Sequence, residues 1–167
     1  CLGLPLSAQA QSGFSLQQQT LPNPDNEPVP VHPVPSPRQL KWQETEFYAF
    51  FHYGMNTYTG LEWGKGNEDV NRFAPTQVPN PEQWLQAAKD AGMRGGIAVI
   101  KHHDGFCLWP TATTNHNATA SSNVNAKKTN IPRDFADAAR KLDMKYGFYI
   151  SPWDRNSALY EIGRAHV

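Results

Sequence analysis

Residues 96–106 of the chain are Gly-Ile-Ala-Val-Ile-Lys-His-His-Asp-Gly-Phe. The first five are almost wholly apolar, which is typical of a parallel strand buried on both faces. A cation, two imidazoles and a carboxylate follow at the carboxyl end of this strand, where α/β barrels place their active-site residues. His102 and His103 point to opposite sides of an extended strand, so they share one pocket only if the backbone turns. Gly105 permits such a turn.

The same pattern recurs on either side of this strand. Apolar runs at 47–51 and 146–150 also lead into polar residues, and two helical patterns separate the three strands. Asn80-Pro81 is a helix cap followed by Pro at the first position, and Gly92 fits the stop. The second helix carries an apolar stripe at Phe135, Ala138, Ala139 and Leu142. We therefore expect an α/β fold, namely the first three β-strands and two intervening helices of a partial (β/α)8-type, TIM-like barrel with right-handed crossovers.

Composition excludes several classes of function. The chain has 167 residues, and its 15 basic and 15 acidic side chains leave no charge excess of the kind that binds nucleic acid. It contains no apolar run of the length that crosses a membrane. Cys1 and Cys107 form neither a disulfide framework nor a zinc motif. We expect no cofactor and no metal, and no feature of the sequence indicates an oligomeric state.

The two ends differ from the middle. Residues 1–10 resemble the remnant of a secretory signal peptide, which ends in an Ala-x-Ala pattern at Ala8-Gln9-Ala10 and predicts an exported, periplasmic or secreted protein. Cys1 is a candidate for lipid modification. Residues 11–38 are a Pro- and Gln-rich linker, in which the prolines, up to Pro37, disfavour helix and central strand. Residues 39–160 are the N-terminal part of the barrel, and 161–167 resemble a translated sequencing adapter.

The residues that follow the three strands share one chemistry. Imidazole and carboxylate groups can bind vicinal sugar hydroxyls, and an aromatic face can cover the apolar side of a pyranose. Each signal is weak alone, and the two histidines could also be ordinary strand-end residues or half of a metal site. Their recurrence at three strand ends indicates a sugar site. The candidate site residues are His52, Glu62, Trp63, His102, His103, Tyr149 and Trp153.

Several motifs follow one another along the chain. They are Phe50-Phe51-His52-Tyr53-Gly54, Glu62-Trp63, Phe73-Ala74-Pro75, Trp84, Lys101-His102-His103-Asp104-Gly105-Phe106-Cys107-Leu108-Trp109, Arg133-Asp134 and Gly147-Phe148-Tyr149-Ile150-Ser151. In this order the motifs resemble the N-terminal part of the α-L-fucosidases of glycoside hydrolase family 29, over residues 39–160. Ser151-Pro152-Trp153-Asp154-Arg155-Asn156 is most similar to the branch that cuts α-1,3/1,4-linked fucose.

The resemblance implies a (β/α) barrel followed by a β-sandwich, and a fucosylated glycan as substrate. His52, His102 and His103 match histidines that bind fucose, Glu62 and Trp63 match a pair that lines the site, and Tyr149 lies in the strand that supplies a site tyrosine. The implied mechanism is retaining hydrolysis with two carboxyl groups. The family's nucleophile and acid/base lie beyond Asn156, so we expect no catalytic residue within this chain, and expect the chain alone to be inactive and unstable.

Neighbouring residues receive supporting roles. We expect Asp104 to orient its turn by accepting hydrogen bonds, Lys101 to be a supporting cation and Cys107 to be buried and inert. Asp143 ends the second helix, where Asp tolerates a left-handed conformation. Asn117-Ala118-Thr119 fits the glycosylation sequon, a triplet that often arises by chance.

Two other hypotheses compete with the enzyme. One is a carbohydrate-binding protein that uses the same histidines and aromatic rings without catalysis. The other is a metal-dependent hydrolase with His52, His102 and His103 as ligands. The fucosyl linkage and the natural glycan stay open.

Overall fold

The computed structural model describes residues 33–160, and its centre is a parallel sheet of three strands. The strands are β1 (Ala49–Phe51), β2 (Gly95–Lys101) and β3 (Lys145–Ile150), and they lie in the order β1-β2-β3. Phe51 pairs with Ala98, and Ala98 pairs with Phe148. The predicted α/β class and the predicted order of strands and helices are confirmed. The predictions for residues 1–32 and 161–167 lie outside the described residues.

Helix α3 (Pro81–Asp90) begins as the sequence predicts, and helix α4 (Ile131–Lys141) contains the predicted apolar residues Phe135, Ala138 and Ala139. The Asn80 side chain accepts a hydrogen bond from the Gln83 backbone N–H at 3.2 Å, and Asn130 caps α4 in the same way. After α3 the chain turns at Gly92, whose φ is 86°, and after α4 it turns at Asp143, whose φ is 52°. The predicted stop at Gly92 and the predicted left-handed Asp143 are both confirmed.

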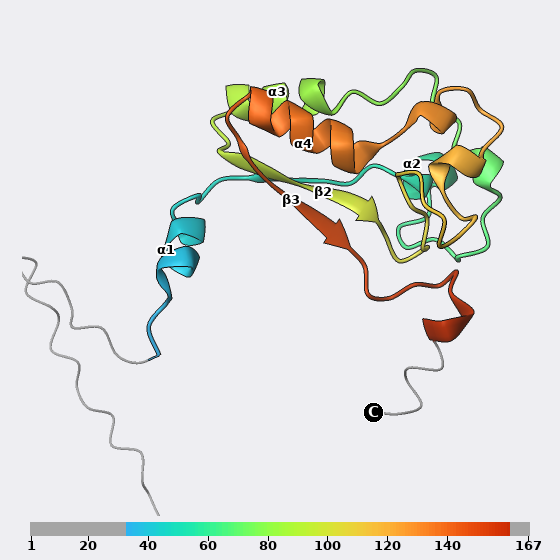
Figure 1. Cartoon of the computed structure of the whole chain (residues 1–167), viewed down its shortest axis with the longest axis horizontal. Helices are drawn as coiled ribbons and strands as arrows, with labels where there is room; N and C mark the ends of the chain where they lie inside the picture. The colour runs from blue at the N-terminus through green and yellow to red at the C-terminus, as the bar shows by residue number, and fades with distance from the viewer. Residues whose placement is uncertain (1–32, 161–167) are drawn as a thin grey trace, which may run out of the picture. The chain divides into compact units, whose positions relative to one another are not determined.

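Both helices pack on the same face of the sheet (Figure 1). Leu85 of α3 and Phe135 of α4 are fully buried there, and they meet over Gly96 of β2. A Cβ atom at Gly96 would lie only 3.0 Å from the Leu85 Cδ2 atom and 3.1 Å from the Phe135 Cζ atom. The three strands lie in the order in which they occur in the chain, and the two β-α-β crossovers place α3 and α4 on the same face of the sheet. This arrangement differs from a doubly wound sheet, which has helices on both faces.

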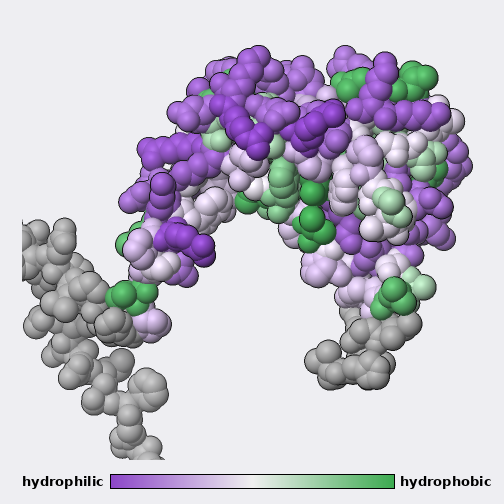
Figure 2. Space-filling model, in the orientation of Figure 1, coloured by the Kyte–Doolittle hydropathy of each residue, from purple (hydrophilic) through white to green (hydrophobic). Residues whose placement is uncertain are grey.

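The other face of the sheet is apolar and is only partly covered by the described residues, since Val99 is buried there whereas Phe50 is not. Phe50 of β1 contacts Tyr149 of β3 on this face, with ring centroids 5.8 Å apart, and Phe50 is 44% exposed. Strand alternation places Ile97 and Val99 of β2 on the same side. Figure 2 shows hydrophobic residues on the side of the sheet away from α3 and α4, whose outer surfaces are polar.

Two short helices were not predicted. Helix α1 (Pro37–Gln43) begins at Pro37, so the expectation that the proline-rich segment disfavours helix is wrong at its end. The physical reason is that proline fits the first helical position, where its missing N–H is not needed. Helix α2 (Met55–Thr59) has five residues, too few to produce an amphipathic pattern. Strand β1 starts at Ala49, two residues later than expected.

Candidate functional site

The turn after β2 brings His102 and His103 together. The Gly105 backbone N–H donates to the His102 carbonyl at 3.0 Å, and Gly105 has a φ of 78°. The two imidazole centroids lie 4.3 Å apart, so the predicted turn is confirmed. A Cβ atom at Gly105 would lie 2.3 Å from the Asp154 Oδ1 atom, so a larger residue would displace the loop after β3, which carries Asp154.

His52 and Glu62 join His102 around a cavity of about 210 Å³. His52 follows β1, and its ring centroid lies 5.9 Å from that of His102. The Asn56 side chain donates to the backbone carbonyls of Leu61 and Glu62 at 2.6 and 2.5 Å, which fixes the loop that carries Glu62. The cavity is therefore lined by the imidazoles of His52 and His102 and by the carboxyl groups of Glu62 and Asp104, which come from the loops after β1 and β2.

His102 favours its neutral form. Burial lowers the pKa of His102 below its ordinary value, nearby His103 and His52 lower it further, and Glu62 opposes them. Its Nδ1 atom is buried and has no hydrogen-bond partner among the described residues. A neutral imidazole both donates and accepts, which suits it to a ligand with hydroxyl groups.

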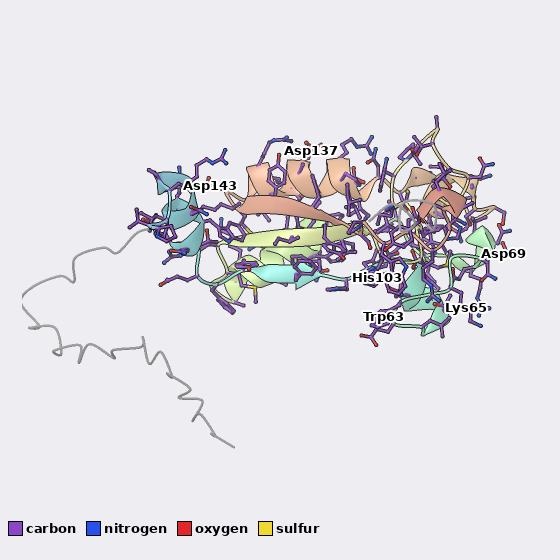
Figure 3. All side chains as sticks on the ribbon, turned by 90° about the horizontal axis from the view of Figure 1, so that it is seen from below. Trp63, Lys65, Asp69, His103, Asp137 and Asp143 are labelled. Atoms are coloured by element: carbon purple, nitrogen blue, oxygen red, sulfur yellow. The ribbon has the colours of Figure 1, made fainter. Side chains whose placement is uncertain are left out.

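An aromatic surface lies beside this cavity. The His103 ring lies 4.9 Å from Trp153 and 6.1 Å from Trp63, and the two indoles are 5.7 Å apart. Trp63 is 50% exposed, so part of its ring is free to contact a ligand. Trp63 and His103 lie at one end of the sheet, and Asp143 lies at the other (Figure 3).

Tyr149 completes the set. It lies on the open face of β3, and its ring centroid is 6.5 Å from that of His102. The structure thus brings all seven candidate residues to the carboxyl end of the sheet, four around the cavity or on the open face and three on the aromatic surface. Their contact with a sugar stays a prediction.

The loops that carry these residues are tied to one another, and sequence reasoning missed the ties. Lys101 Nζ forms an ion pair with the Asp154 carboxylate at 2.7 Å. Arg155 donates to the Gly64 carbonyl at 2.6 Å, and Asn156 donates to the Gly66 carbonyl at 2.7 Å. Burial opposes ionisation of Asp154, but the Lys101 cation outweighs it and lowers the pKa of Asp154. The partners in each of these contacts are far apart in the sequence, so no local sequence pattern predicts the contacts.

Ser151 was also missed as a residue with a role of its own. It is buried directly after β3, and its Oγ atom lies 2.6 Å from His103 Nδ1 and 2.7 Å from the Trp153 carbonyl oxygen. Ser151 belongs to a motif of the sequence, but a serine that directly follows a strand carries no signal of its own.

Asp104 lines the cavity and is not part of the aromatic surface. It is 1% exposed, and its Oδ1 atom accepts a hydrogen bond from the Phe106 backbone N–H at 2.8 Å. Burial, followed by the nearby charges of Glu68 and Asp154, raises the pKa of Asp104 to about 6. The expected turn-orienting role is confirmed by this hydrogen bond.

Two further residues behind the site are enclosed. Cys107 is buried, and burial raises the pKa of its thiol to about 11, so the thiol is inert as expected. The sequon residue Asn117 is 4% exposed. Its amide donates to the Thr114 carbonyl at 2.7 Å, and its oxygen accepts from the Thr119 backbone N–H at 2.9 Å.

Two features of residues 33–160 bear on the other classes of function. No three His, Cys, Asp or Glu side chains in this range come together closely enough to hold a metal ion, so the metal-hydrolase hypothesis has no ligand set there. None of the helices in the same range combines the length and the apolar character needed to cross a membrane.

Comparison with known proteins identifies the family. A model of the α-L-fucosidase family matches residues 38–166. The chain belongs to the α-L-fucosidase family. The α-L-fucosidase 1 of Arabidopsis thaliana is 41% identical over 133 residues, which is 80% of this chain and 26% of the plant protein.

Solved structures of α-L-fucosidase relatives share the fold. A glycoside hydrolase family 29 member from a rumen bacterium is 48% identical, with a TM-score of 0.71, over 77% of this chain and 23% of that one. A Ruminococcus gnavus family 29 fucosidase, solved in complex with fucose, is 33% identical, with a TM-score of 0.66, over 79% of this chain and 27% of that one. The chain thus spans about a quarter of the length of these relatives.

Proposed function

We propose that the complete protein is a glycoside hydrolase that releases terminal α-L-fucose from glycoconjugates. The observation that carries the proposal is the meeting of His52, His102 and His103 with two indoles at one end of the sheet, in a chain of the α-L-fucosidase family. The Ruminococcus gnavus relative was solved with fucose bound, which supports the same sugar here.

The site chemistry fits a deoxy sugar. Fucose has an apolar face with a methyl group and an edge of hydroxyls. Trp63 and Trp153 present apolar surface, while the imidazoles of His52, His102 and His103 present donors and acceptors to the hydroxyls. Glu62 adds a hydrogen-bond acceptor at the cavity. Tyr149, on the open face of the sheet, borders the site on the side of β3. The proposed specificity is the α-1,3/1,4 branch, which the Ser151–Asn156 motif supports.

We further propose that β1, β2 and β3 are the first strands of an eight-stranded barrel. Their sequential order, with both helices on one face, supports this. The uncovered apolar face of Phe50 and Tyr149 would become the barrel interior.

The proposed mechanism is retaining, with a nucleophile and an acid/base supplied by residues beyond Asn156. Among the described carboxylates near the site, Asp154 is paired with Lys101. Glu62 and Asp104 both line the cavity, but Asp104 is buried, and its Oδ1 atom accepts from the Phe106 backbone N–H. On this proposal the 167-residue chain alone binds fucose poorly and does not hydrolyse fucosides.

The second candidate function is fucose binding without hydrolysis. The pairing of Asp154 with Lys101 favours it, because this carboxylate near the site is then not free to act in catalysis. We also propose that the protein is exported, on the Ala-x-Ala pattern at Ala8-Gln9-Ala10. Amino-terminal sequencing of the secreted or periplasmic protein checks cleavage after Ala10.

Kinetics of the complete protein with an aryl α-L-fucoside test the enzyme proposal. We expect hydrolysis with an α-anomeric first product, observed by proton NMR, and severe losses of kcat/KM in His102→Ala and in His103→Ala, because hydroxyl contacts strengthen in the transition state. Unchanged kinetics in both variants would refute the site. Fucose binding without hydrolysis would favour the second candidate.

A further inference from the structure

Ser151 is fixed with respect to the site histidines. Its backbone N–H donates to the carbonyl of Lys101, the last residue of β2, at 2.9 Å, which continues the pairing of the two strands one residue past the end of β3. Its side chain is buried, with 1% of the residue exposed. The Ser151 hydroxyl is therefore held at one place beside the turn that carries His103.

The hydrogen-bond partners of this hydroxyl determine where its hydrogen lies. Ser151 Oγ contacts the Trp153 carbonyl oxygen at 2.7 Å and His103 Nδ1 at 2.6 Å. A hydroxyl has one hydrogen, and a carbonyl oxygen can only accept. The hydrogen must therefore point to Trp153, and Ser151 Oγ must accept from His103. It follows that His103 Nδ1 carries a hydrogen.

This assignment fixes the other nitrogen of the ring. In a neutral imidazole one nitrogen donates and the other accepts, so Nε2 of neutral His103 has a free lone pair. The ring cannot easily swing away, because it lies between His102 at 4.3 Å and Trp153 at 4.9 Å. The His103 carbonyl is also held, by the Arg155 backbone N–H at 2.9 Å.

We propose that Ser151 is a positioning residue that locks neutral His103 in the Nδ1–H tautomer, so that Nε2 accepts a hydrogen bond from a hydroxyl of the bound sugar. The lock follows from the described contacts alone, whereas the sugar hydroxyl as donor rests on the proposed function. The lock gives His103 a single role, and it distinguishes His103 from His102, whose Nδ1 has no partner among the described residues.

Nitrogen-15 NMR of the complete protein, labelled at histidine, tests the lock directly. At alkaline pH, two-bond proton–nitrogen correlations should show a protonated Nδ1 and a bare Nε2 for His103. The signals are assigned by their loss in His103→Gln. A wild-type His103 with a bare Nδ1 overturns the proposal, and this measurement needs no variant of Ser151 that folds.

Ser151→Ala is the matching perturbation, and Ser122→Ala, at an exposed serine, is its control. We expect Ser151→Ala to move the His103 proton to Nε2 or to mix both tautomers, and to lower kcat/KM for an aryl fucoside by roughly tenfold, the scale of one lost hydrogen bond. Ser122→Ala should change neither. An unchanged His103 spectrum in folded Ser151→Ala overturns the proposal.

The two proposals fail in different ways. A locked His103 in a protein that neither binds nor hydrolyses fucosides overturns the sugar part of the proposal together with the proposed function, while it supports the lock. Fucoside hydrolysis with a bare Nδ1 overturns the lock and leaves the proposed function standing.

Discussion

Trp63 and Trp42 offer a matched pair of indoles. They are 50% and 47% exposed, but Trp63 lies beside His103, whereas Trp42 lies in α1 and packs on Tyr48. We expect Trp63→Ala to lower kcat/KM for an aryl fucoside by about ten- to a hundredfold, because covering an aromatic face contributes about 1.5–3 kcal/mol. Trp42→Ala should leave kcat/KM within about twofold. Equal losses in both variants would mean that Trp63 acts through stability and not through the sugar.

Asp104 predicts a pH-dependent stability. Its pKa is raised from 3.8 to about 6 in the folded protein, so folding favours the protonated carboxyl. The stability that the protonated form contributes is complete below pH 3.8 and is lost as pH rises through about 6. Asp104→Asn stays neutral and keeps an oxygen that can accept from the Phe106 N–H.

Asp104→Asn should therefore gain stability over the wild type as pH rises, by up to about 3 kcal/mol at about pH 8. Denaturant unfolding at a series of pH values measures the difference. Asp137→Asn, on the exposed side of α4, controls for the loss of one negative charge (Figure 3). A difference that shrinks toward high pH would contradict the assignment of Asp104 as the titrating group.

Single residues also show where sequence reasoning reaches its limit. The clustering of the three histidines could be predicted, because the carboxyl ends of parallel strands meet at one edge of the sheet. The contacts of Ser151 with His103 and of Arg155 with Gly64 could not, because they join loops whose conformations depend on each other. The resemblance to a family named the residues of the site but not the ones that hold them.

At the scale of elements, the packing of α3 and α4 depends on Gly96. A Cβ atom there would lie 2.7 Å from the Phe51 ring and 3.0 Å from Leu85, both of which are held by the core. Gly96→Ala should cost about 1–3 kcal/mol in the free energy of unfolding, the usual cost of overpacking.

Gly147→Ala is the control, because its Cβ atom would have ordinary contact with Ile97 at 3.6 Å. Thermal or denaturant unfolding of the complete protein compares the two. If Gly96→Ala were as stable as Gly147→Ala, the packing of α3 and α4 on the sheet would not depend on Gly96.

The main elements could be predicted because their signals are local. Asn80 and Asn130 cap α3 and α4, and apolar runs mark the strands. Helix α2 and the start of α1 could not, since the former is too short for a periodic pattern and the latter begins within a run of prolines. At Pro37 the local pattern does not distinguish linker from helix, because proline is compatible with both an extended segment and the first position of a helix.

At the scale of the whole molecule, the sheet has one covered face and one open one. On the open face Phe50 is 44% exposed, and the described residues supply no element to cover it or to pair with β1 and β3 at their outer edges. Parallel sheets are stable when both faces are covered. The proposed barrel would supply the missing cover.

We therefore expect residues 39–160, produced alone, to aggregate or to unfold without cooperativity, and to lack fucosidase activity. Size-exclusion chromatography, thermal unfolding and fucoside hydrolysis check this, with the complete protein as the control. A soluble monomer that unfolds cooperatively and hydrolyses fucosides would contradict both the barrel proposal and the placement of the carboxylates beyond Asn156.

The buried amide of Asn117 has a consequence for production of the protein in a eukaryotic secretory host. Its side-chain nitrogen donates a hydrogen bond to the Thr114 carbonyl, and the residue is buried. An oligosaccharide on this nitrogen therefore cannot be accommodated in the folded state. Any glycan there would have to be added to the nascent chain before this loop closes. Each such addition would divert a molecule from folding, so yield and glycan occupancy should compete, and Asn117 is the sequon to remove first when the gene is adapted to yeast.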